Sequence, residues 1–245
     1  MKAQAARDLG QRIAAHVQAG RMSAAYALLA PVLAERTPFP RLGYIGEAVG
    51  AGPLHAVNRF LDRVAAARTE GGWVVIGSAL GQQLECDLTG ALSRCRSFII
   101  AADVWYATDI LGERVPGPAL IAHLPSALNL LAPWRQDANR WVRRAVGVAF
   151  HFWAKRSRGA PEYIPRAKEL LALLEPMFEE QDEDAIKGVG WGLKTLGKYY
   201  PDLLTDWLAQ QVVHRQRRPR ALMLRKALTY LPARQRARAM GGQSP

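Results

Sequence analysis

Apolar residues recur every three or four positions along most of the chain, as in residues 28–33, 54–64 and 170–178. This spacing places side chains on one face of an α-helix. The short β-branched run GWVVIGSAL, residues 72–80, follows a Gly-Gly turn and is more readily the start of a helix than a strand. Prolines and glycines interrupt the helical pattern at short intervals. The pattern therefore predicts an all-α protein of about a dozen helices, each roughly 10–18 residues long.

The helices from about residue 117 onward are predicted to form successive antiparallel pairs. Two of them, within residues 139–152 and 185–201, share basic residues interleaved with small and apolar ones. Similarity at a period of about 40 residues is typical of HEAT-like repeats, and one helix of each pair lines the concave side of such a solenoid. We expect a HEAT-like α-solenoid whose concave groove is basic if the arginine-bearing helices line it. Residues 1–232 are assigned to a single HEAT-like domain and residues 233–245 to a basic, disordered tail.

The net charge of the chain indicates what kind of partner it binds. Thirty-three Lys and Arg against 21 Asp and Glu give a formal net charge of +12 and a pI near 10.2, and no acidic residue follows Asp206. Such an excess favours a polyanionic partner, because each neutralised phosphate releases condensed counterions. A general arginine bias of the source genome is the alternative. Nucleic acid is the better explanation of the two.

Other features of the sequence exclude several classes of protein. The chain does not open with a charged segment followed by an apolar one, and no apolar run is long enough to span a bilayer. The two cysteines, Cys86 and Cys95, are too few for a disulfide framework, and the five histidines are scattered singly. We therefore expect an intracellular monomer with no metal and no cofactor.

Trp105 and Asp109 stand near the end of the apolar run FIIAADVWYATDIL. Four residues correspond to about 40° around a helix, so both side chains point the same way, one turn apart. Asp103 lies far round the same helix. Two interpretations are open: a core tryptophan beside a capping or ion-paired aspartate, or an indole and a carboxylate that form one wall of a site.

The segment WRQDANRWVRRAVGVAF concentrates arginines. Asp137 is predicted to cap the N-terminus of its helix. Arg140 and Arg144 share one face at i, i+4, and Arg143 lies beside them. Like charges at this spacing repel by about a few tenths of a kcal/mol unless an anion lies between them. Phosphate is such an anion, and arginine binds it bidentately. The alternative is a solvated basic face.

Trp191 is flanked by Gly188, Gly190 and Gly192 inside a helical pattern. Three glycines cost about 2–3 kcal/mol of helix propensity relative to alanine. Close helix packing would explain this cost, and so would a need for space beside the indole. In the second case Gly190 and Gly192 would expose much of the tryptophan ring.

Together and in this order, the three segments resemble the AlkD-type DNA glycosylases, bacterial all-helical HEAT-like enzymes that excise cationic alkylated purines. VWYATDIL is similar to the family's W-W-D-x-V-D segment, so Trp105 and Asp109 fall on its active-site tryptophan and catalytic aspartate. NRWVRRAV is similar to W-L-x-R-A-A and places Arg144 on the arginine that borders the catalytic cleft. IKGVGWGLKTLGKYYPDLL is similar to K-A-I-G-W-x-L-R-E-Y-x-K-x-x-P-x-x-V and places Trp191 on the second active-site tryptophan, with Lys194 on a basic position beyond it.

The resemblance also implies a set of DNA-binding cations. The closing helix LMLRKALTYLP is similar to the family's R-E-A-I-K-x-I helix, with Arg225 on its arginine. The chain also departs from the family: Val104 and Tyr106 replace the first tryptophan and the first aspartate of the W-W-D-x-V-D segment, and Glu183 and Asp184 replace an aromatic pair ahead of the tryptophan helix. With the neighbouring basic residues included, the candidate DNA-binding residues are Arg140, Arg143, Arg144, Lys187, Lys194 and Arg225.

The resemblance implies a catalytic set of Asp109, Trp105 and Trp191 and a partner that is double-stranded DNA containing alkylated purines. It places the protein in the bacterial cytoplasm, on the nucleoid when bound. A cationic purine leaves without a general acid, so the demand falls on the oxocarbenium-like sugar. Asp109 would stabilise that cation and align or deprotonate water, while the indoles face the deoxyribose and the lesion. The family route leaves the lesion stacked in the duplex, which tolerates bulky adducts.

Two non-enzymatic functions remain open at this point. Proteins of this fold that lose catalysis act as HEAT-like DNA-binding or branched-DNA-binding proteins, and a HEAT-like scaffold can bind acidic proteins. Relatives that lose catalysis usually keep the basic groove and lose the tryptophans and aspartate. This chain retains both sets of residues, which favours the enzyme.

Overall fold

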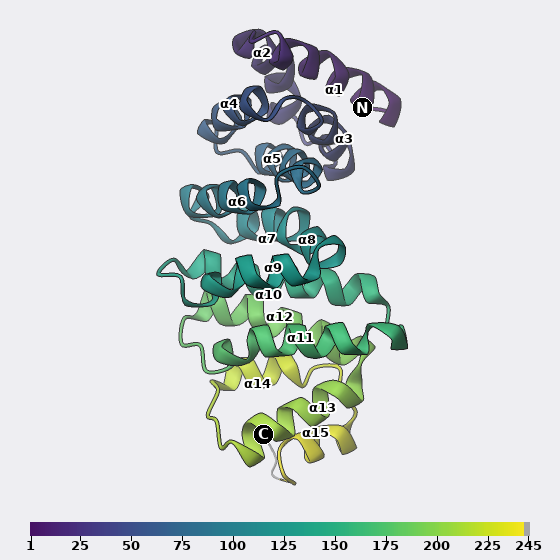
Figure 1. Cartoon of the computed structure of the whole chain (residues 1–245), viewed down its shortest axis with the longest axis vertical. Coiled ribbons are helices and arrows are strands. Elements are labelled where there is room, and N and C mark those ends of the chain that lie inside the picture. The colour runs from purple at the N-terminus through teal and green to yellow at the C-terminus, as the bar shows by residue number, and fades with distance from the viewer. Residues whose placement is uncertain (243–245) are drawn as a thin grey trace. The chain divides into compact units, whose positions relative to one another are not determined.

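The computed structural model describes residues 1–242 as two compact units, one over Met1–Val115 and one that begins at Pro116. Within residues 1–242 the chain forms helices and turns and no strand (Figure 1), so the all-α prediction is confirmed. Helix α5, Glu70–Gln83, contains the β-branched run, which confirms its helical interpretation. The single domain expected over residues 1–232 stays a prediction.

The first unit consists of two rows of helices. Helices α1, α3, α5 and α7 pack one on the next, and α2, α4 and α6 pack against this row. Two layers in which each helix pair stacks on the previous pair are the arrangement of HEAT-like repeats. The helices are α1 Ala3–Gln18, α2 Met22–Ala34, α3 Phe39–Gly50, α4 Leu54–Ala66, α5 Glu70–Gln83, α6 Leu88–Ala102 and α7 Trp105–Arg114.

The second unit repeats this arrangement. Helices α8, α10, α12 and α14 pack one on the next, and α9, α11, α13 and α15 belong to the other row (Figure 1). The successive helix pairs predicted after residue 117 are thus confirmed. The helices are α8 Pro116–Ala122, α9 Leu124–Leu131, α10 Arg140–Ser157, α11 Ile164–Leu174, α12 Glu183–Tyr199, α13 Pro201–Ala209, α14 Ala221–Ala227 and α15 Ala233–Ala239, with short 3₁₀ turns at Ala132–Gln136, Pro161–Tyr163 and Glu175–Met177 and a π-helical turn at Gln210–His214.

Polar caps start the two helices that carry most of the candidate residues. The sequence predicted Asp137 as the N-cap of α10, but the N-cap is Asn139. The Asn139 side chain accepts from the backbone N–H groups of Trp141 and Val142. Asn139 immediately precedes the first helical residue, so its oxygen reaches the second and third free donors. Asp137 instead accepts from the Asn139 N–H at 2.9 Å. Asp182 caps α12 in the same way.

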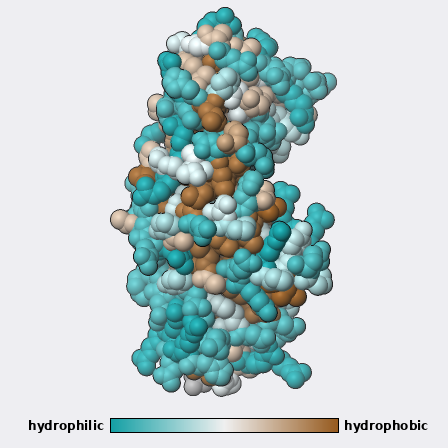
Figure 2. Space-filling model, viewed as in Figure 1, coloured by the Kyte–Doolittle hydropathy of each residue, from teal (hydrophilic) through white to brown (hydrophobic). Residues whose placement is uncertain are grey.

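The chain beyond Pro232 differs from the predicted tail. Residues 233–239 form α15, which packs on α13. The physical reason lies in α13, which supplies acidic partners: Asp206 pairs with Arg238, and Asp202 accepts from Gln235 at 2.6 Å. Residues 243–245 of the predicted tail lie outside the described residues. Figure 2 shows the surface of this C-terminal part, at the bottom of the view, as mostly hydrophilic.

No helix within residues 1–242 combines the length and the apolar character that crossing a bilayer requires.

Candidate nucleic-acid interface and active-site residues

Helix α7 of the first unit begins at Trp105, and Asp109 follows one turn later. Trp105 is 55% exposed, and its ring lies nearly perpendicular to that of Tyr106, with 5.9 Å between the ring centroids. Asp109 is half-buried. The interpretation of Trp105 as a core residue is therefore wrong. This end of α7 presents an indole to solvent one turn before a carboxylate.

The three candidate arginines of α10 lie in the second unit and make three different contacts. Arg143 forms a two-point ion pair with Glu180, at 2.8 and 3.3 Å, and the two side chains are only 17% and 11% exposed. Arg140 is more exposed and lies 3.4 Å from a carboxylate oxygen of Asp184. Arg144 is 7% exposed and donates to the backbone carbonyl of Asp184 at 3.2 Å.

These contacts with acidic side chains and a backbone carbonyl offset the repulsion between the three neighbouring arginines on α10. The sequence suggested an external anion between Arg140 and Arg144. In the structure Asp184 contacts both residues, Arg140 through its carboxylate and Arg144 through its backbone carbonyl. Asp184 is one of the two acidic residues that replace the family's aromatic pair. Glu183, the other, pairs with Lys187 at 2.7 Å, and this contact lowers the pKa of the Glu183 carboxyl.

Glycines bring the backbones of α10 and α12 into contact. A Cβ added to Gly147 would lie 2.3 Å from the backbone of Gly188, and one added to Gly188 would lie 2.4 Å from the Arg144 carbonyl oxygen. Gly192 faces the Gly147 carbonyl in the same way. Since real Cβ atoms do not approach so closely, only glycine permits this helix separation. Close packing therefore explains Gly188 and Gly192.

Gly190 is explained by Lys226, a lysine that is not among the candidate residues predicted from the sequence. A Cβ at Gly190 would lie 2.6 Å from Cδ of Lys226 on α14, so the lysine stem occupies the space that a side chain would fill. Gly190 lies between Lys187 and Lys194 on one stripe of α12, three residues after the first and four before the second. The glycine thus places the Lys226 amine within this basic stripe, rather than exposing the Trp191 ring.

The cations around Lys226 form a cluster, hereafter the cationic cluster, of Lys187, Lys194, Arg225 and Lys226. The pKa of the Lys226 amine is lowered, first by burial of the side chain and then by the positive charges of Lys194, Arg144, Arg225 and Lys187. Tyr230, an exposed aromatic residue, has its ring 5.2 Å from the Lys194 amine. Crowded cations beside an exposed ring are the composition of surfaces that bind nucleic acid.

Trp191 of α12 is half-buried and has a ring partner. The imidazole of His151, on α10, stacks on the indole with 3.8 Å between the ring centroids and 23° between the planes. His151 Nδ1 lies 2.7 Å from the hydroxyl of Thr195. Nothing in the sequence indicated this contact, because the histidines are scattered singly and the stack joins positions on two helices.

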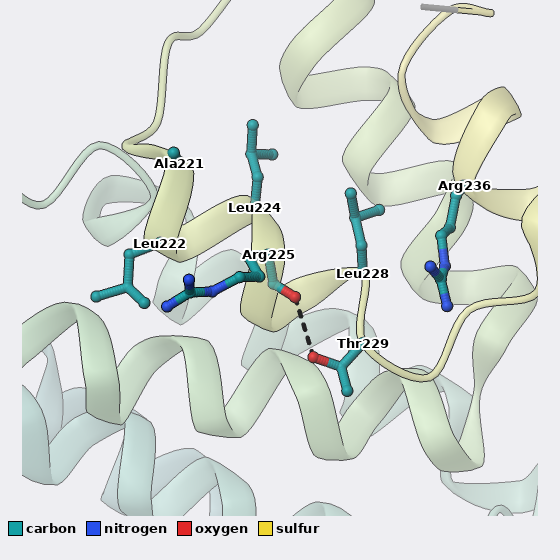
Figure 3. Close-up of a pocket in the computed structure, with 7 residues that line it drawn as sticks. All are labelled: Ala221, Leu222, Leu224, Arg225, Leu228, Thr229 and Arg236. Atoms are coloured by element: carbon teal, nitrogen blue, oxygen red, sulfur yellow. Dashed lines mark hydrogen bonds between the residues drawn. The ribbon is translucent and has the colours of Figure 1, made fainter. Parts of the chain in front are cut away.

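A pocket of 590 Å³ lies between α14 and Arg236 of α15 (Figure 3). Its wall is mainly apolar, and Arg225 belongs to both the pocket and the cluster. Thr229 donates to the Arg225 carbonyl at 3.0 Å. The lining residues are Ala221, Leu222, Leu224, Arg225, Leu228, Thr229 and Arg236. Neither proposed catalytic tryptophan is among them.

The predicted site residues are thus divided between the units. Trp105 and Asp109 belong to the first unit and the remaining candidates to the second. Within the second unit the structure brings Arg144, Lys187, Lys194 and Arg225 around Lys226. It places Arg143 in an ion pair with Glu180 instead. Among residues 1–242 there is no group of three or more His, Cys, Asp or Glu side chains that could hold a metal ion.

Comparisons with known proteins identify the family of the chain and support its fold. Residues 75–231 match the sequence profile of a family described as "DNA alkylation repair enzyme". The fold is similar to that of the alkylpurine DNA glycosylase AlkC of Pseudomonas fluorescens, solved bound to DNA that contains an abasic site analog. That likeness has a TM-score of 0.58 at 18% sequence identity and covers 97% of this chain and 67% of the other. No curated protein matches the chain.

Proposed function

Because the chain belongs to the DNA alkylation repair enzyme family, we propose that it is a DNA glycosylase acting on cationic N3- or N7-alkylated purines in duplex DNA. The observation that carries this proposal is the 55% exposed indole of Trp105, one turn before the Asp109 carboxylate. Folding favours burial of so large an apolar ring, so a ligand explains its position better. An indole face and an anion both attract a cationic purine and a cationic sugar.

The proposed reaction requires from the protein mainly a negative charge placed beside the deoxyribose. Alkylation at N3 or N7 gives the purine a fixed positive charge, so the base departs without protonation. The bond from C1′ to the base breaks, and the deoxyribose becomes an oxocarbenium-like cation. Asp109 stabilises this cation and orients or deprotonates the water that attacks C1′. The products are the free base and an abasic site.

DNA binding is assigned to the second unit. The cationic cluster would neutralise backbone phosphates, and a bound phosphate would relieve the repulsion between its positive charges, which adds to burial in lowering the pKa of Lys226. Arg140, the more exposed arginine, extends the basic surface along α10, and the buried Arg144 adds positive charge beneath it. Arg143 supports this surface indirectly, because its pairing with Glu180 joins the start of α10 to the turn before α12.

The exposure of Trp105 supports the proposal that the lesion is recognised without base flipping. An enzyme that flips a base encloses it in a pocket, whereas an indole at the surface can contact a nucleotide that stays stacked. Such a site sets no limit on the size of the alkyl group, so bulky adducts are proposed as substrates too. The AlkC structure, solved with an abasic site analog, concerns DNA of the same kind as the proposed product.

The proposed function is tested by incubating the protein with duplex DNA that contains N-methylpurines. We expect free 7-methylguanine or 3-methyladenine to appear, measured by chromatography of the released bases, together with abasic sites in the DNA. Binding of the duplex without release would show a non-catalytic DNA-binding protein. If the protein neither releases base nor binds DNA with a salt-dependent affinity, only the protein-binding scaffold remains as its function.

Lys226→Ala is expected to weaken binding of damaged and undamaged duplex equally. The plot of log affinity against log salt concentration has a negative slope, and removing one phosphate contact should make that slope shallower by about one. Fluorescence anisotropy titrations at several salt concentrations measure this slope. Lys168→Ala provides the matched control, since Lys168 is an exposed lysine on α11, in the other row of helices. An unchanged slope in Lys226→Ala would remove this lysine from the DNA interface.

A further inference from the structure

The indole of Trp191 is held on one of its faces. His151, only 7% exposed, covers that face with its imidazole at a centroid distance of 3.8 Å. Trp191 itself is half-buried, and a ligand that stacks on the indole can do so only from the face that His151 does not cover. The imidazole therefore decides the plane in which the indole meets a ligand.

Two hydrogen bonds join His151, Thr195 and Trp191. The Thr195 hydroxyl donates to the backbone carbonyl of Trp191 at 3.0 Å. When it does so, its oxygen is left to accept from Nδ1 of His151, which lies 2.7 Å away. The three residues form a closed ring of contacts: imidazole to hydroxyl, hydroxyl to the tryptophan backbone, and indole back to imidazole.

The glycine contact between the helices sets the height of this stack. Gly147 lies one turn before His151 on α10 and packs on the backbone of Gly188, which lies nearly one turn before Trp191 on α12. Two backbones in contact cannot slide along each other without steric overlap. The imidazole is consequently held level with the indole and with Thr195, one turn further along α12.

We propose that His151 is a positioning residue for Trp191: anchored through Nδ1 to Thr195 and stacked on the indole, it holds that ring ready to receive the cationic alkylpurine on its opposite face. This inference rests on the proposed function. Holding the ring in one orientation before binding removes the loss of side-chain freedom that binding would otherwise entail.

His151→Ala and Thr195→Val are both expected to lower kcat/KM for release of a cationic methylpurine by about tenfold, with binding of undamaged duplex unchanged. Thr195→Ser keeps the hydroxyl and should restore the wild-type value. Acrylamide quenching of Trp191 fluorescence, obtained as the difference between each protein and its Trp191→Phe version, should increase in His151→Ala. His214→Ala, at an exposed histidine of the same unit, should change none of these quantities.

A double-mutant cycle separates this inference from the proposed function. In a Trp191→Phe background, His151→Ala should cause little further loss, because the residue acts through the indole. Multiplicative losses would overturn the inference by showing that His151 acts on the substrate independently. Equal activity of Thr195→Val and Thr195→Ser would overturn it too, and this pair is informative even if His151→Ala does not fold. A protein that releases no base at all would refute the proposed function instead.

Discussion

Asp109→Asn should reduce the release of 7-methylguanine or 3-methyladenine from duplex DNA by about 10³-fold or more. Asparagine has nearly the same shape as aspartate but carries no charge, so it neither stabilises the oxocarbenium-like sugar nor deprotonates water. Binding of the duplex should be nearly unchanged, because the proposed phosphate contacts lie on α10, α12 and α14. Single-turnover release of the base and anisotropy titration of the same duplex measure the two effects separately.

Asp103→Asn is the control for this experiment. Asp103 terminates α6 six residues before Asp109, in a left-handed conformation with φ of 48°. Asparagine tolerates this conformation well, so the substitution removes a nearby charge with little strain. Full activity in Asp103→Asn is expected. A variant Asp109→Asn that still releases base at the wild-type rate would refute the catalytic assignment.

Gly147→Ala is expected to give the largest loss of stability from a single added methyl group. The new Cβ would lie 2.3 Å from the backbone of Gly188, and neither helix backbone can move aside as a flexible side chain would. Overpacking of this kind costs about 3 kcal/mol, which corresponds to a fall of roughly 5–10 °C in melting temperature. Thermal unfolding followed by circular dichroism measures it. Base release should fall as well, because Arg144, His151 and Trp191 depend on this helix pair.

Gly43→Ala makes the same chemical change where space exists. An added Cβ on α3 would meet the Ser78 hydroxyl at 3.6 Å, an ordinary contact distance. Alanine favours helix over glycine by about 1 kcal/mol, so this variant should melt at the wild-type temperature or above it. Equal melting temperatures for the two variants would show that the glycine contact does not hold α10 and α12 together.

The sequence was sufficient for features that depend on neighbours along the chain. Helical periodicity predicted the all-α fold and the pairing of helices, since it reflects burial of one face of each helix. The spacing of Trp105 and Asp109 placed them one turn apart for the same reason. The sequence did not determine the N-cap of α10. Asp137 and Asn139 are both good caps, and only the position of the first helical residue decides between them.

Features that depend on packing between helices were decided only by the tertiary structure. Arg143 looked like its neighbours, yet Glu180, 37 residues away, makes it an ion-pair residue. Gly190 looked like space for a ligand beside Trp191, yet the Lys226 stem fills that space. His151 carried no signal until α10 and α12 were in contact. The chain itself determined helical period, excess charge and the order of its candidate residues, because these follow from local spacing and composition. Only the packed structure decided which cations face an acid, which face one another and which ring covers the indole, because such pairs join residues distant in sequence.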